Sequence, residues 1–150
     1  MSEKTKFSNP DIDIHRKLAE WAALCAEHTL HIFEEDQDTD KRPRLAIETL
    51  RAWMRGEKTM VECRAAAFAA HAAAREASSP AAIAAARAAG QATAVAHMYT
   101  HCSHAADYAA KAAMFYLDSD LQAKRFKEER EWQWEQLSEY LRSIGFPKGI

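Results

Sequence analysis

Large apolar residues recur every three or four positions along most of the chain, which is the spacing of amphipathic helices. The clearest stripe lies in residues 11–33, where Pro10 and Asp11 supply a start signal. The inward positions of this first predicted helix are Ile14, Leu18, Trp21, Cys25, His28 and Ile32. The acidic residues 34–40 show no such spacing and predict a loop.

Gly, Pro and capping residues divide the next part of the chain into three predicted helices. These helices cover residues 43–55, 59–77 and 80–97. Thr59 and Glu62 have the spacing of a capping box, which favours a helix start at Thr59. Pro80 fits the first position of the following helix, where its missing N–H would have no helical partner in any case.

The boundary after the fourth helix is open in the sequence. Residues 97–104 contain neither Gly nor Pro. The fourth helix could therefore continue into a fifth, or break near Thr100 or Ser103. The fifth helix is expected to end near Tyr116.

A sixth helix is predicted from a cap at Asp118 or Ser119 to about Ser143. Its expected inward positions are Phe126, Trp134, Leu137, Leu141 and Ile144. Gly145 follows as a residue that could end the helix in the left-handed conformation.

Alanine changes the packing expected of these helices. About half of residues 65–113 are Ala, and Gly90 lies within the same region. Alanine has the highest helix propensity and its small side chain lets helix axes approach closely. The chain has only two Val residues, so strands are not expected. The predicted fold is all-α, a compact bundle of five to six helices with an Ala-rich inner group formed by the third, fourth and fifth.

Length and charge restrict the classes of function. The 150 residues predict a single domain over 1–150, with residues 1–10 as a loose N-terminal tail. A net charge of −2 favours no nucleic-acid partner. No apolar stretch has the length of a membrane span, and the first residues lack the apolar core of a signal peptide. The three Cys residues are odd in number and far apart, which indicates reduced thiols and a cytoplasmic protein.

The segment AHMYTHCSH contains the first candidate site. If residues 87–108 form one helix, His97, His101 and His104 share a face. A metal ion such as zinc would need further ligands from another helix, and His28 and Cys25 of the first helix are the best candidates. Two other interpretations stay open: histidines that pack and bond to neighbours, and an acid–base or ligand pocket. No other cofactor is indicated.

A second polar row lies on the third helix. Arg64, His71 and Arg75 flank an aromatic residue, Phe68, on one helix face. Arginines at both ends of such a row could bind an anion or a carboxylate. The alternative is that their stems lie along alanine and their charged ends reach solvent.

The sixth helix carries a candidate partner surface. Trp132 is two residues from Trp134, so the two rings point to opposite sides of a helix. Trp132, Gln136 and Tyr140 would then form an outward row that contacts a protein partner, either a second copy of the chain or a different protein. The alternative is a partly exposed Trp132 resting on the stems of arginines.

Four segments carry a resemblance to a known family. They are WAALCAEHTLHIFEE (21–35), DKRPRLAIETLRAW (40–53), AAAFAAHAAAREA (65–77) and AAARAAGQATAVAHM (84–98). Together they resemble the immunity-protein-5-like family of bacterial immunity proteins. The resemblance implies an all-helical cytoplasmic protein that neutralises a toxin by binding it, and it assigns no catalytic residue.

The sequence supports two functional hypotheses. The first is a non-enzymatic cytoplasmic binding protein, an immunity protein whose partner is a cognate toxin, with a homodimer as a further possibility. The second is a small helical metal- or ligand-binding protein that uses the face of His97, His101 and His104. No nucleophile–base motif or phosphate-binding loop is present to indicate an enzyme.

Overall fold

The computed structural model describes residues 8–117 and 120–150, and within these ranges the chain is helical with no β-strand. The elements are α2 (Ile12–Asp36), α3 (Arg42–Met54), α4 (Met60–Glu76), α5 (Pro80–Ala94), α6 (His101–Phe115), α7 (Gln122–Glu135), a 3₁₀ turn η1 (Glu139–Leu141) and α8 (Arg142–Gly145). The prediction of an all-α bundle is confirmed. None of the helices in the described part is long and apolar enough to cross a membrane.

Side-chain caps start several of these helices where the sequence predicts them. The Asp11 carboxylate accepts hydrogen bonds from two backbone N–H groups in the first turn of α2. The Thr59 hydroxyl accepts from the Glu62 N–H at 3.1 Å, and the Glu62 carboxylate accepts from the Thr59 N–H at 3.1 Å. This confirms the capping box. The Ser79 hydroxyl accepts from the Ala82 N–H at 3.1 Å and caps α5. The predicted cap at 118–119 lies outside the described residues.

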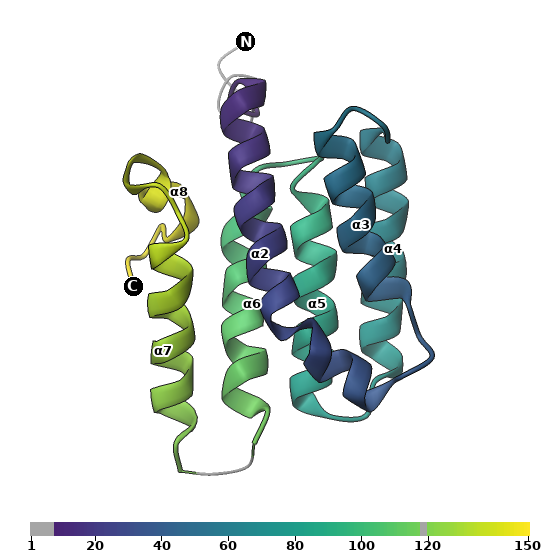
Figure 1. Cartoon of the computed structure of the whole chain (residues 1–150), viewed down its shortest axis with the longest axis vertical. Coiled ribbons are helices and arrows are strands. Elements are labelled where there is room, and N and C mark those ends of the chain that lie inside the picture. Colours follow the sequence, from purple (N-terminus) through teal and green to yellow (C-terminus); the bar gives the residue numbers. More distant parts are fainter. Residues whose placement is uncertain (1–7, 118–119) are drawn as a thin grey trace.

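The helix α5 is the centre of the bundle. It packs against α2, α3, α4 and α6, and α2 crosses in front of α5 and α6 in Figure 1. Ten of its fifteen residues are buried, and these are eight Ala, Gly90 and Thr93. The helix α4 buries only one side, and its outer side exposes 62% of Phe68. The close packing that alanine predicts is therefore concentrated at α5 and α6, with α4 at the edge.

A turn separates α5 from α6, which settles the boundary that the sequence leaves open. The helix α5 ends at Ala94, three residues before the predicted end at His97, and α6 begins at His101. The Asn9 side-chain amide donates to the His97 carbonyl at 3.0 Å and accepts from the Tyr99 N–H at 2.9 Å. Since Asn9 comes from the N-terminal segment, tertiary contacts hold this turn in place of a Gly or Pro. The predicted loose tail therefore does not extend to Asn9.

The prediction of one long sixth helix is wrong. The helix α7 ends at Glu135, and the chain turns back through η1 and α8. This turn brings Leu137 and Leu141 into the core, where 3% and 2% of their surface is exposed, and Phe146 packs against Trp21 with ring centroids 5.5 Å apart. A straight helix would carry these apolar groups away from α2, so their burial favours the break.

The sequence predicts that Gly145 ends a helix in the left-handed conformation. In the structure it instead allows close packing. The positive φ angles of the described residues are at Gly56 and Gly149. A Cβ atom on Gly145 would lie 2.6 Å from Leu137 and 2.8 Å from the Trp21 ring. Any side chain here would push the C-terminal turn off α2.

Candidate functional site

The histidine segment lies at the turn between α5 and α6. His97, His101 and His104 therefore do not share the face of one continuous helix. His97 is exposed in the turn, and His101 is the first residue of α6. The His101 Nδ1 pairs with the Gln91 side-chain oxygen at 2.8 Å. His104 is exposed, with its ring centroid 5.9 Å from that of His101. Asp107, a possible partner of His104, pairs with a lysine at 3.0 Å.

The other two residues of the candidate metal site lie apart from this turn. His28 pairs through Nδ1 with Glu129 of α7 at 2.5 Å. Cys25 is completely buried, and burial raises its pKa well above the usual value. Among the described residues, no three His, Cys, Asp or Glu side chains are grouped so that they could hold a metal ion. The structure therefore does not bring the five candidate ligands together, and metal analysis of untagged protein is the direct test for zinc.

A pocket does bring together the histidine segment and the polar row of α4. Its volume is about 240 Å³, and its polar lining is Arg64, His71, Gln91, His97 and His101. Two groups of residues thus face one space, although they lie about 30 positions apart in the sequence. Only the tertiary packing of α4 on α5 creates this arrangement.

The two half-buried histidines of this pocket are held in the neutral state. Burial lowers the pKa of His71, and nearby Arg87 and Arg75 lower it further. Burial also lowers the pKa of His101, with smaller contributions from the other histidines around it. Arg75 is thus close enough to influence His71, although it does not line the pocket.

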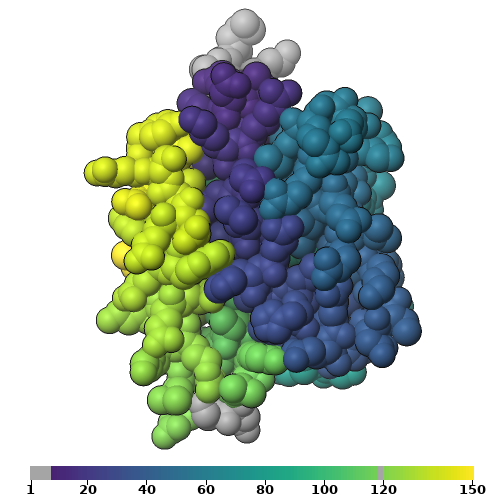
Figure 2. Space-filling view, in the orientation of Figure 1, coloured from purple at the N-terminus to yellow at the C-terminus, as the bar shows by residue number. Residues whose placement is uncertain are grey.

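A larger cleft lies elsewhere, between α2, α6 and α7. Its volume is about 380 Å³, and its lining includes His28, His31, Tyr116, Glu129 and Trp132. Figure 2 shows a hollow in the surface where α6 is visible between α7 and the lower part of α2. The Trp132 ring stacks on His28 with centroids 3.7 Å apart and planes 12° apart. Aromatic and charged groups therefore share one wall of an open cleft.

Two residues of the predicted partner surface, Trp132 and Tyr140, contact α2, and the third, Gln136, lies between them in the sequence. Trp132 is half-buried on α7, Gln136 is exposed just after it, and Tyr140 is 59% exposed in η1. Lys17 of α2 donates to the Tyr140 hydroxyl at 3.0 Å. The break after α7 means that these residues are not one helical row. The Trp132 ring stacks on His28 of α2.

Two buried polar residues of α7 were not predicted from the sequence. Glu129 is 9% exposed and Gln133 is completely buried. The Gln133 amide donates to the Ala106 carbonyl at 2.8 Å, and the Trp21 indole N–H donates to the Gln133 carbonyl at 2.8 Å. The spacing of four between Glu129 and Gln133 is the only signal in the sequence, and it fits an exposed helix face equally well.

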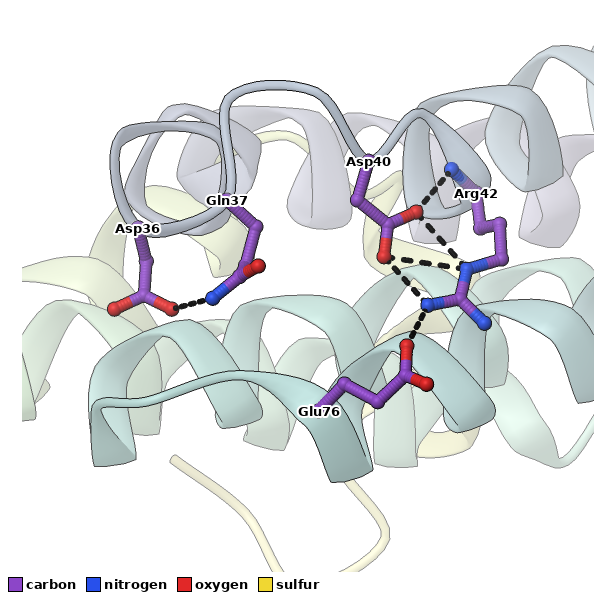
Figure 3. Close-up of polar contacts among 5 residues, drawn as sticks. All are labelled: Asp36, Gln37, Asp40, Arg42 and Glu76. Carbon is purple, nitrogen blue, oxygen red and sulfur yellow. Dashed lines mark hydrogen bonds and ion pairs between the residues drawn. The ribbon is translucent and has the colours of Figure 1, made fainter.

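The arginines of the DKRPRLAIETLRAW segment are engaged in ion pairs. Figure 3 shows Arg42 bonded to both oxygens of Asp40, with Nη2–Oδ2 at 2.6 Å, and also to Glu76 of α4. In the same view Asp36 accepts from the Gln37 amide at 3.1 Å. These contacts join the loop between α2 and α3 to the end of α4.

Two further arginines of this segment pair with α2. Arg44 binds Glu34 through two parallel bonds of 2.6 and 2.7 Å. Arg51 pairs with Glu27 at 2.5 Å and also with Glu20. The segment that carries much of the family resemblance therefore positions α3 against its neighbours, and its arginines are not free to bind a ligand.

Comparisons with known proteins agree with the resemblance seen in the sequence. Neither curated proteins nor solved structures gave a match. The family described as "Imm-5 like putative immunity protein" matches residues 10–140, which include α2 to α7 and the polar contacts described above. Because this match spans most of the 150-residue chain, the protein belongs to the Imm-5 like family of immunity proteins.

Proposed function

We propose that this protein is a non-enzymatic immunity protein that neutralises a toxin by binding it. The observation that carries the proposal is the family match over residues 10–140. A toxin-binding function requires an accessible surface with anchor residues, and it requires no catalytic group. The α2–α7 surface, which we define by Lys17, Trp132, Gln136 and Tyr140, has this character.

The chemistry of the α2–α7 surface supports a protein partner. Tyr140 exposes 59% of its surface, although its hydroxyl is already positioned by Lys17. Trp132 is fixed by stacking on His28, so it would lose little side-chain freedom when a partner covers it. Gln136 adds exposed amide donors and acceptors between the two aromatic residues. Positioned aromatic residues with a polar surround are typical anchors of protein interfaces.

The cleft beside Trp132 extends this surface. It offers about 380 Å³ into which a side chain of the partner can insert. Contacts at the centre of an interface contribute most when a side chain fills such a depression and excludes water. Trp132 therefore belongs both to the cleft and to the flatter surface beside it.

The proposal predicts a cognate toxin encoded next to this gene, and co-expression with the products of the adjacent genes tests it. Titration calorimetry with an inactive toxin variant should show binding, and Trp132→Ala and Tyr140→Ala should each weaken it by about tenfold or more. Leu45→Ala is the matched control, because Leu45 is 54% exposed on α3 and outside the α2–α7 surface. Its affinity should stay near that of the wild type.

Two outcomes would contradict the proposal. Absence of any complex with the neighbouring toxin would remove the toxin-binding function. Binding unchanged by both aromatic substitutions would place the toxin on another surface. Sedimentation of wild type and Trp132→Ala separately tests the homodimer, since a monomeric wild type excludes self-association through Trp132.

A further inference from the structure

The pocket between α4, α5 and the α5–α6 turn contains cationic groups without carboxylate partners. Arg64 makes no ion pair with any described residue, and its guanidinium lies 5.7 Å from the centroid of the Phe68 ring. Phe68 itself is 62% exposed. An arginine held over an exposed ring at the mouth of a pocket presents its N–H groups to solvent.

The histidines of the same pocket have donor capacity that the protein does not use. His71 has no hydrogen-bond partner among the described residues. In the same part of the chain, every fully buried side-chain nitrogen does have a partner. The His71 ring nitrogens therefore reach solvent in the pocket. His101 uses Nδ1 for Gln91, which leaves Nε2 without a protein partner.

The lining of the pocket contains no Asp or Glu to compensate this charge. Residues 77–106 include Arg87 and three histidines but no Asp or Glu. On α4, Glu62 is held by Lys58 and by its own helix cap, and Glu76 is held by Arg42. The described residues thus leave this side of the molecule with a local cationic excess, although the whole chain has a net charge of −2.

We propose that this pocket binds a carboxylate side chain from an acidic segment of a protein partner. Arg64 donates to the carboxylate at the mouth, and the free nitrogens of His71 and His101 donate from inside when the rings are protonated. Phe68 and Val61, two helical turns apart on α4, cover the apolar part of the same segment. The proposal goes beyond the toxin-binding function and does not depend on the α2–α7 surface.

A protein segment fits the pocket better than a bare anion or a nucleic acid. Phe68 and Val61 are 62% and 69% exposed, and such apolar neighbours would contact nothing in a complex with inorganic phosphate. Nucleic-acid surfaces carry extended rows of paired phosphate contacts, whereas this pocket has one arginine at its mouth. A carboxylate next to an apolar side chain matches both features.

Gly90 determines where the His71 ring lies. A Cβ atom at Gly90 would be 2.6 Å from Cε1 and Nε2 of His71, so a larger residue would displace the ring from the face of α5. The segment AAARAAGQATAVAHM thus contains, in Gly90, Gln91 and His97, three residues that shape or line one pocket.

Binding should depend on pH in a defined direction. Burial and the charges of Arg75 and Arg87 lower the pKa of His71, so it is neutral at pH 7.5. His97, His104 and His71 act on His101 in the same direction. A bound carboxylate favours the protonated imidazole, and binding therefore takes up protons and tightens as the pH falls from 7.5 to 6.0.

The test uses two short peptides and inorganic phosphate. Acetyl-Phe-Glu-Glu-amide and its counterpart with Gln in place of Glu are titrated into the full chain, with the histidine ring signals followed by nuclear magnetic resonance. The acidic peptide should shift His71 and His101 saturably and bind about tenfold more tightly than the Gln peptide. Its affinity should be higher at pH 6.0 than at pH 7.5.

Arg64→Gln should weaken the acidic peptide by about fivefold to tenfold, because it removes a charge-assisted contact at an exposed site. Arg16→Gln is the matched control, since Arg16 is an exposed, unpaired arginine on α2. Both positions are exposed, so both variants should fold. Equal binding of the two peptides, equal loss in the two variants, or phosphate binding as tight as the acidic peptide would each overturn the proposal.

Discussion

The arginines of α3 differ from those of α4 and α5 in whether they form ion pairs. Arg42, Arg44 and Arg51 all pair with carboxylates of α2, α4 or the loop before α3. Arg64 and Arg87 have no ion pair with a described residue. The same residue type therefore fixes helix positions on one side of the molecule and stays available on the other.

The difference shows how charge is distributed in a chain that is nearly neutral as a whole. The carboxylates of α2, such as Glu27 and Glu34, face α3 and are occupied there. None is provided in residues 77–106, and burial together with the nearby charges of Arg87 and Arg75 lowers the pKa of His71. Paired arginines indicate a structural role, and unpaired ones beside an open pocket indicate a binding role.

The largest expected effect concerns α5, against which both α3 and α4 pack. Ala89→Leu should destabilise the fold by about 1–3 kcal/mol, because Ala89 is completely buried and the added atoms have no space. Thermal and urea unfolding measure the change. Ala65→Leu, at an exposed position of α4, is the control and should alter stability by less than about 0.5 kcal/mol. Equal tolerance of both would mean that α5 is not the centre of the bundle.

A smaller effect separates the two groups of arginines directly. Arg51→Ala should cost about 1 kcal/mol of unfolding free energy, since it leaves Glu20 and Glu27 without their shared partner. Arg87→Ala should change stability by less than about 0.5 kcal/mol, because Arg87 is exposed and has no carboxylate partner. Urea unfolding of both variants at low and high salt gives the comparison. If Arg87→Ala were the more destabilising, the assignment of roles would be reversed.

The smallest effect is a difference in pH dependence. In the folded protein the pKa values of His71 and His101 lie below the ordinary value of 6.5, so the unfolded chain protonates first as the pH falls. Stability should therefore decline from about pH 6.5 downwards, and the double change of these residues to Gln should flatten this range.

The α3 side responds in a different pH range. Hydrogen bonds from arginine lower the pKa values of Glu34 and Asp40 from 4.5 and 3.8. The stability that they provide is present above those values and is lost as the pH falls below them. Glu34→Gln should thus lower stability above about pH 4.5, where Glu34 is ionised, and make the decline in the acid range shallower. Urea unfolding between pH 3 and 7.5 measures both ranges, and a decline that begins only below about pH 4.5 would contradict the histidine effect.

Local patterns were sufficient to predict the helices and several of their starts. The Thr59–Glu62 capping box, Pro80 at the beginning of α5 and the stripe of α2 depend on residues within one or two turns. Such interactions form in any context that permits a helix, so sequence spacing is enough to identify them. The family resemblance likewise rests on local segments, and it is confirmed.

The candidate sites could be predicted only in part, for a physical reason. Arg64, His71, His97 and His101 were each identified, but their meeting in one pocket depends on the angle at which α4 packs on α5. Trp132 was identified as a surface residue, whereas its stacking on His28 required the position of α7 beside α2. The type of each side chain can be read directly from the sequence. The distances between helices depend on tertiary packing and cannot be read in this way.

The sequence by itself determined the helical class, most helix starts and the alanine surface that allows close packing. Tertiary structure alone decided where two helices end. The turn after Ala94 is held by Asn9, and the turn after Glu135 forms because Leu137 and Leu141 gain burial against the core. In both places helix propensity permits continuation, and contacts with distant residues stabilise the break by more than the few local hydrogen bonds that it removes.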